Sequence, residues 1–152
     1  MADILRDLAP DRAKGMYRTL LNGECYAANA HHGLGQLEAA RGFYREASGH
    51  LRVAAQLAPT DMDIRNDLGV VYMQMRRLAD ARFELMTALE LGENDLRVAG
   101  NLLTLLLYED QWTQASDLLN RLNLPPAQFE TAQQRAQQLL QEDARMPAVA
   151  TE

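Results

Sequence analysis

A cysteine and two adjacent histidines are the residues of this sequence with the clearest potential for chemistry. Cys25 is the only cysteine, and His31 and His32 follow it closely. Side chains of these types bind zinc when they come as spaced pairs that converge on one ion. Neighbouring helical residues point about 100° apart, so His31 and His32 do not readily share an ion. We therefore predict no metal site.

Nucleophilic and phosphate-binding chemistry has equally little support. Cys25 would need a neighbouring base and a lowered pKa to act as a nucleophile, and an unreactive loop thiol is the simpler interpretation. Gly33 and Gly35 fall within a predicted helix, not after a strand, so they do not make a phosphate loop. We predict no catalytic residue, no cofactor and no enzymatic activity. The alternative is an enzyme or metal protein centred on Cys25, His31 and His32.

Composition narrows the class of protein. The 152 residues are 47% hydrophobic, which suits one continuous core, and Ala, Leu, Gln, Glu and Arg favour helix. The net charge of -6 argues against a nucleic-acid partner, because such binding needs a basic face. A single cysteine allows no internal disulfide. No apolar run approaches the ~20 residues of a membrane span, and the charged residues 1–7 do not look like a signal peptide.

The elements that position these residues follow an internal repeat. Matching residue types recur at a spacing of about 34 residues, the period of a helix-turn-helix array. Six sets share this spacing: Leu34, Leu68 and Leu102; Gly35, Gly69 and Leu103; Tyr44, Leu78 and Trp112; Ala47, Ala81 and Ala115; Leu51, Leu85 and Leu119; and Ala54, Ala88 and Leu122. We expect the small residues to let paired helices approach closely, and Tyr44 and Trp112 to lie in the core.

The repeat predicts one domain over residues 1–152. It divides into a partial leading repeat (3–27), three full repeats (28–61, 62–95 and 96–126), a capping helix (127–143) and a flexible tail (144–152). Glu38 replaces the apolar residue of the later repeats, so we expect looser packing there. Gly92 is expected to end its helix in a left-handed conformation. The capping helix has a predicted apolar stripe of Phe129, Ala132, Ala136, Leu139 and Leu140.

The pattern resembles the tetratricopeptide-repeat (TPR) family over residues 28–126. The resemblance rests on Leu68-Gly69-x-x-Tyr72, on Ala81-x-x-x-Leu85-x-x-Ala88 and on Pro59, with matching residues one period away. It implies an all-α, right-handed α-α superhelix of helix-turn-helix repeats, closed by the C-terminal capping helix. Because fold does not fix function, the family alone does not identify a ligand.

Members of this family usually bind an extended peptide or a helix in a concave groove lined by the first helix of each repeat. The resemblance therefore implies a protein partner. The groove-facing positions in this sequence are Asn29, His32, Gln36, Asp63, Asn66, Asp67, Val70, Met73, Gln74, Arg97, Asn101, Thr104, Leu107 and Tyr108. His31 is instead expected to pack within its helix pair.

The side chains at these positions indicate the kind of partner. One TPR subgroup clamps the C-terminal carboxylate of chaperones with Lys and Arg, but Arg97 is the only lysine or arginine here. Val70, Met73, Leu107 and Tyr108 instead predict an apolar floor between polar rims. Such a floor suits an amphipathic helix or a short apolar peptide.

Three stretches also resemble bacterial TPR lipoproteins of tight-adherence (Flp) pilus systems. They are Arg65–Gly69, Ala81–Leu91 and Asn101–Leu107. The resemblance implies a pilotin-like assembly factor at the outer membrane, facing the periplasm, with a secretin or another pilus component as partner. The sequence departs from that group because no lipoprotein signal is visible. The alternatives are a cytoplasmic TPR adaptor or co-chaperone with another peptide, and a structural subunit that forms a homodimer through residues 102–107.

Overall fold

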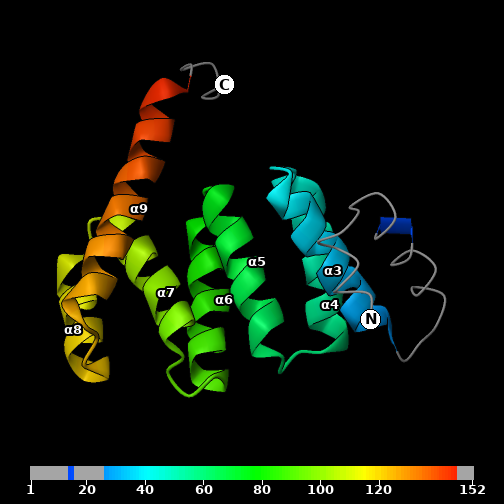
Figure 1. Cartoon of the computed structure of the whole chain (residues 1–152), viewed down its shortest axis with the longest axis horizontal. Helices are drawn as coiled ribbons and strands as arrows, with labels where there is room; N and C mark the ends of the chain where they lie inside the picture. The colour runs from blue at the N-terminus through cyan, green and yellow to red at the C-terminus, as the bar shows by residue number, and fades with distance from the viewer. Residues whose placement is uncertain (1–13, 16–25, 147–152) are drawn as a thin grey trace. The chain divides into compact units, whose positions relative to one another are not determined.

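The computed structural model describes residues 14–15 and 26–146, and the described chain is helical without strands (Figure 1). This confirms the predicted all-α helical-repeat class. The helices over residues 26–146 are α3 (Ala27–Ala40), α4 (Tyr44–Leu57), α5 (Met62–Gln74), α6 (Leu78–Leu91), α7 (Leu96–Tyr108), α8 (Trp112–Leu122) and α9 (Pro126–Arg145). The predicted leading repeat, apart from residues 14–15 and 26–27, and residues 147–152 of the tail lie outside the described residues.

The chain divides into two compact units, Met1–Gly92 and Glu93–Glu152. In the first unit α3 pairs with α4, α5 pairs with α6, and α4 also packs against α5. In the second unit α7 packs against both α8 and α9. The predicted limits of the domain and its repeats stay a prediction.

The repeat is visible in the backbone of the turns between paired helices. Each turn has one left-handed residue: Gly42 (φ 81°), Arg76 (φ 59°) and Asp110 (φ 60°). The next amide donates to a carbonyl five residues earlier: Phe43 N to Glu38 O, Arg77 N to Tyr72 O and Gln111 N to Leu106 O, each at 2.8 Å. Corresponding atoms in the three turns are thus one period of about 34 residues apart.

Glycine allows the first two helix pairs to pack closely. A Cβ atom at Gly35 of α3 would lie 2.6 Å from Leu51 Cγ of α4. A Cβ atom at Gly69 of α5 would lie 2.7 Å from Leu85 Cγ of α6. Both distances are well inside carbon–carbon van der Waals contact. The same close contact therefore recurs one period later, as the repeated glycines predicted.

Helix ends follow from local side chains, with one difference from the prediction. The Asp61 carboxylate caps α5 by accepting from Ile64 N at 3.1 Å, and Asp95 caps α7 in the same way. The prediction for Gly92 was wrong: its φ is -91°, while Glu93 and Asn94 have positive φ. The left-handed residues therefore follow Gly92, and both are exposed.

The core confirms most of the predicted small and apolar positions, including Ala47, Ala81 and Ala115, which are fully or almost fully buried. Trp112 was wrongly predicted to lie in the core. Its side chain is 52% exposed, because the first residue of α8 lies at the edge of its helix pair, where the indole N–H donates to Asp110.

Two further positions differ from the sequence prediction. Leu140 was wrongly included in the buried stripe of α9, since it is half exposed whereas Ala132, Ala136 and Leu139 are buried. Glu38 does not loosen its surroundings: it is buried, and Lys14 donates to its carboxylate. Lys14, which precedes α3 in the sequence, therefore compensates the charge of Glu38 in the core.

Candidate partner-binding face

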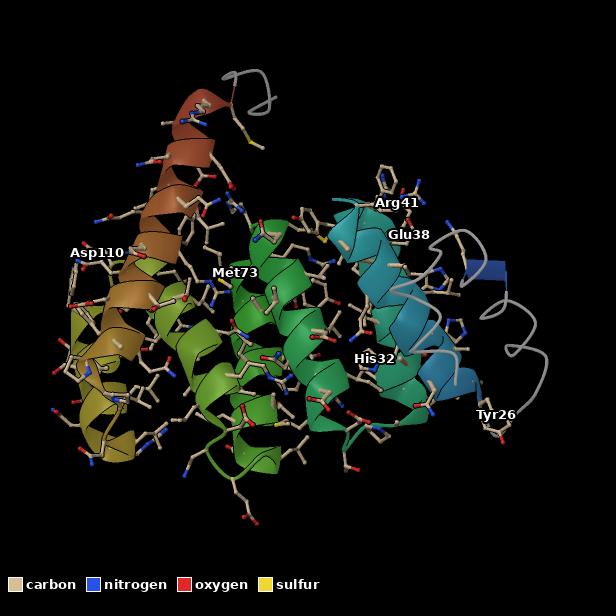
Figure 2. The ribbon with its side chains drawn as sticks, viewed as in Figure 1. Tyr26, His32, Glu38, Arg41, Met73 and Asp110 are labelled. Carbon is tan, nitrogen blue, oxygen red and sulfur yellow. The ribbon has the colours of Figure 1, made fainter. Side chains whose placement is uncertain are left out.

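Three of the predicted groove residues meet in the first unit. His32 and Gln36 lie one turn apart on α3, and both contact Asp67 of α5, on the side of α3 where Figure 2 labels His32. His32 Nε2 lies 2.6 Å from Asp67 Oδ2, and Gln36 Nε2 donates to the same oxygen at 2.9 Å. A carboxylate only accepts, so His32 donates through Nε2. The cluster fixes one oxygen of Asp67 between two repeats.

The other oxygen of this carboxylate is not part of the cluster. Among the described residues, no hydrogen bond reaches Asp67 Oδ1. The Asp67 side chain is 28% exposed and that of His32 is 17% exposed. A positioned, partly exposed carboxylate oxygen is suited to accept from a backbone amide or a cationic side chain of a partner.

Further predicted residues surround this cluster in the first unit. Asn29 and Asp63 are exposed, and Val70 and Gln74 are half-buried. Together with His32, Gln36 and Asp67 they form what we call the candidate face. Asn66 and Met73 of α5 were predicted with them, but their side chains are buried, at 3% and 1% exposure. Met73 therefore contributes to packing beneath the candidate face and does not present its thioether to a partner.

The predicted residues of the second unit are mostly enclosed. Asn101, Thr104 and Leu107 of α7 are buried, and the Thr104 hydroxyl donates to the Gly100 carbonyl of its own helix at 2.8 Å. Tyr108 is half-buried, and its hydroxyl donates to Asp143 of α9. Arg97 is the only one of the five predicted residues in this unit that is exposed, and it lies beside Asp95. Because α9 packs along α7, this unit offers a partner less of the predicted surface than the first unit does.

A polar contact between paired helices was missed by the sequence analysis. His31 Nδ1 of α3 lies 3.1 Å from His50 Nδ1 of α4. One period later, Arg65 of α5 contacts Glu84 of α6 through Nη1, which lies 3.2 Å from Oε1 and 2.9 Å from Oε2. The repeat spacing could have revealed these contacts, because positions 31 and 65, like positions 50 and 84, are one repeat apart. His31 does pack within its helix pair, as predicted.

The His31–His50 contact makes stability depend on pH. Burial, and then the nearby His50, hold the pKa of His31 below its ordinary value of 6.5. The unfolded chain therefore binds a proton more readily than the folded chain, and stability falls as the pH drops through the ordinary histidine value. We expect the free energy of unfolding to decrease more steeply between about pH 7.5 and 5.5 in the unaltered protein than in His31→Asn. Urea unfolding at both pH values measures this, and equal slopes would contradict it.

Two further properties of the described residues bear on function. No group of three or more His, Cys, Asp or Glu side chains among them is arranged to hold a metal ion. Likewise, none of the helices in the described part of the chain has the length and apolar character of a membrane span. Cys25, the third residue of the alternative metal-site hypothesis, lies outside the described residues.

Comparison with known proteins supports the class that the helix pairs define. The family model described as "Tetratricopeptide repeat" matches residues 38–106. This stretch includes α4, α5, α6 and most of α7. These residues therefore match tetratricopeptide repeats, and the described chain belongs to the all-α helical-repeat class. Proteins of this kind generally act as protein-interaction modules.

One curated relative extends the similarity over most of the chain. The "TPR repeat-containing protein PA4299" of Pseudomonas aeruginosa is 41% identical over 133 residues. The match covers 88% of this chain and 54% of the relative. The chain thus spans about half the length of this relative, whose name gives the repeat and no activity.

Proposed function

We propose that this protein is a non-enzymatic scaffold that binds a peptide or helix of a partner protein on the candidate face. The observation that carries the proposal is the Asp67 carboxylate, which His32 and Gln36 hold by one oxygen while no other described residue donates to the second oxygen. Val70 adds a half-buried apolar contact beside it. An extended or helical segment with a donor next to a small apolar side chain fits this arrangement.

We further propose that the partner belongs to a bacterial envelope machine, with a secretin or other component of a tight-adherence pilus as the leading candidate. Support comes from the resemblance of residues 65–69, 81–91 and 101–107 to TPR lipoproteins of such systems. In this proposal the protein works at the outer membrane, facing the periplasm. The second candidate is a cytoplasmic adaptor that uses the same face for another peptide.

Site-specific crosslinking tests both parts of the proposal. A photoreactive amino acid placed at exposed Asn29 reports on the candidate face, and one at exposed Glu90 of α6 is the matched control on a second helix. Soluble and envelope extracts of the source organism are probed separately. We expect a pilus component from the envelope extract to crosslink at position 29 and not at position 90.

An Asp67→Ala change should reduce that crosslink, because removing the acceptor from a charged hydrogen bond costs about 1.5–3 kcal/mol, or roughly tenfold or more in affinity. Glu90→Ala removes a carboxylate from α6 and should leave the yield unchanged. A partner found only in the soluble extract would support the adaptor. Equal crosslinking at positions 29 and 90 would contradict binding at the candidate face.

A further inference from the structure

A hollow of about 280 Å³ opens in the first unit between α4, α5 and α6. Its α5 residues are Arg65, Leu68 and Tyr72, at spacings of three and four. The candidate face uses Asp63, Asp67, Val70 and Gln74 of the same helix, so the two sets share no residue. The hollow is therefore a second feature of the unit, separate from the proposed partner-binding face.

One wall of the hollow is a fixed ion pair. Arg65 Nη1 contacts both oxygens of Glu84, and its Nε donates to the Pro59 carbonyl at 3.0 Å. These three polar contacts hold the ion pair in place. Glu84 itself is only 8% exposed. Because the two charges offset one another, the pair by itself leaves the wall close to neutral.

Arg52 supplies an additional positive charge at the rim. It is exposed on α4, and within the described part of the chain it makes no hydrogen bond or ion pair. Its guanidinium acts on the Tyr72 hydroxyl: burial raises the pKa of Tyr72, and Arg52 opposes that rise. Two arginines and one glutamate thus line the hollow, which leaves one surplus positive charge in a chain whose net charge is -6.

The rest of the lining is largely apolar. Ala55, Leu68, Pro59 and the ring of Tyr72 contribute to it, and Gln56 adds one amide. The volume is near the lower end for a small-molecule pocket, so the ligand must be compact. A guanidinium matches a carboxylate with two parallel hydrogen bonds. A monoanion balances the single surplus charge, whereas a dianionic phosphate would leave one negative charge without a counter-charge.

We propose that this hollow binds a carboxylate with a small apolar body, whose charged group pairs with Arg52 and whose apolar part lies on Leu68 and Tyr72. A free carboxylic acid and the C-terminal residue of a peptide share this chemistry. The proposal does not depend on the candidate face, and its test uses neither that face nor an extract.

N-acetyl-leucine is a suitable probe, and N-acetyl-leucinamide is its uncharged counterpart. Each is titrated to about 10 mM, a range set by the weak binding expected of so small a ligand, into the full ¹⁵N-labelled chain. We expect the backbone amide signals of Ala55, Gln56 and Tyr72 to shift with the acid and not with the amide. Equal shifts with both probes, or none with the acid, would overturn the proposal.

Matched arginine variants test whether the charge of Arg52 binds the carboxylate of the probe. Arg52→Gln should weaken binding of N-acetyl-leucine by about tenfold, as expected for a charge-assisted hydrogen bond. Arg45→Gln changes another exposed arginine of α4 that does not line the hollow, and it should bind as the unaltered protein does. Equal weakening by both variants would contradict a specific site. If the acid binds, acetyl-Gly-Gly-Leu binding more tightly than N-acetyl-leucine would assign the hollow to a peptide terminus, and the reverse order to a free acid.

Discussion

Replacing Ala81 with arginine is expected to abolish the cooperative unfolding transition of the helices around α6. Ala81 is fully buried, and the equivalent residues Ala47 and Ala115 are buried as well. Overpacking a core site costs about 1–3 kcal/mol, and burying a charge without a partner adds several kcal/mol more. Whole domains are stable by only about 5–15 kcal/mol. The substitution therefore removes much or all of the stability.

Thermal unfolding followed by far-ultraviolet circular dichroism measures this effect. Ala79→Arg is the matched control, because it adds the same side chain two residues away, at an exposed position of α6. Its unfolding midpoint should stay close to that of the unaltered protein, since surface substitutions are usually within about 0.5 kcal/mol. An unchanged midpoint for Ala81→Arg would contradict the buried placement of Ala81 and with it the repeat register.

The sequence predicted the helices of the described region well because their apolar residues recur with the repeat. Backbone conformation in the turns was harder to predict. Gly42 is a familiar left-handed residue, but Arg76 and Asp110 adopt the same conformation, which is uncommon for arginine and is seen more often for aspartate. The packing of each helix pair imposes that turn, and the following amide is tied to a carbonyl five residues earlier in all three cases.

The candidate site was predictable only in part. Periodicity placed His32, Gln36 and Asp67 on related faces of α3 and α5, and the structure brings them into contact. Periodicity assigns a direction to each side chain, but it does not say how far a neighbouring helix covers it. Thr104 is buried and bonded within α7, and Tyr108 is bonded to α9. Such coverage depends on tertiary packing, so only the structure separated surface from interior among these positions.

Polar pairs between helices were also beyond the sequence analysis. His31–His50 and Arg65–Glu84 occupy the same place in successive repeats, and Ala99 and Leu118 follow one period later. Three different pairs of residue types therefore occupy corresponding positions of the repeat. A search for repeated residue types misses such a position, because what is repeated there is the space between two helices and not the side chain that fills it.

Substituting alanine for glycine is expected to have opposite effects at Gly69 and Gly49. A Cβ atom at Gly69 would lie 2.7 Å from Leu85 Cγ, 2.9 Å from its Cδ2 and 3.3 Å from its backbone nitrogen. Leu85 is fully buried, so it has little room to retreat. Gly69→Ala should lower the free energy of unfolding by about 1–3 kcal/mol. Gly49 is exposed on α4 and has no atom near its Cβ position, so Gly49→Ala should raise the free energy of unfolding by about 0.5–1 kcal/mol.

Urea unfolding of both variants, with m-values compared, measures the two effects. A rise in the free energy of unfolding of both variants would mean that helix propensity alone decides the two effects. The contact is isolated by adding Leu85→Ala, which costs roughly 2–5 kcal/mol alone but vacates the space that the new Cβ needs. In that background Gly69→Ala should become neutral or stabilising, and the difference is the coupling energy of the pair. Gly35 and Leu51 offer a second test of the same close contact, one repeat earlier, and should respond in the same direction.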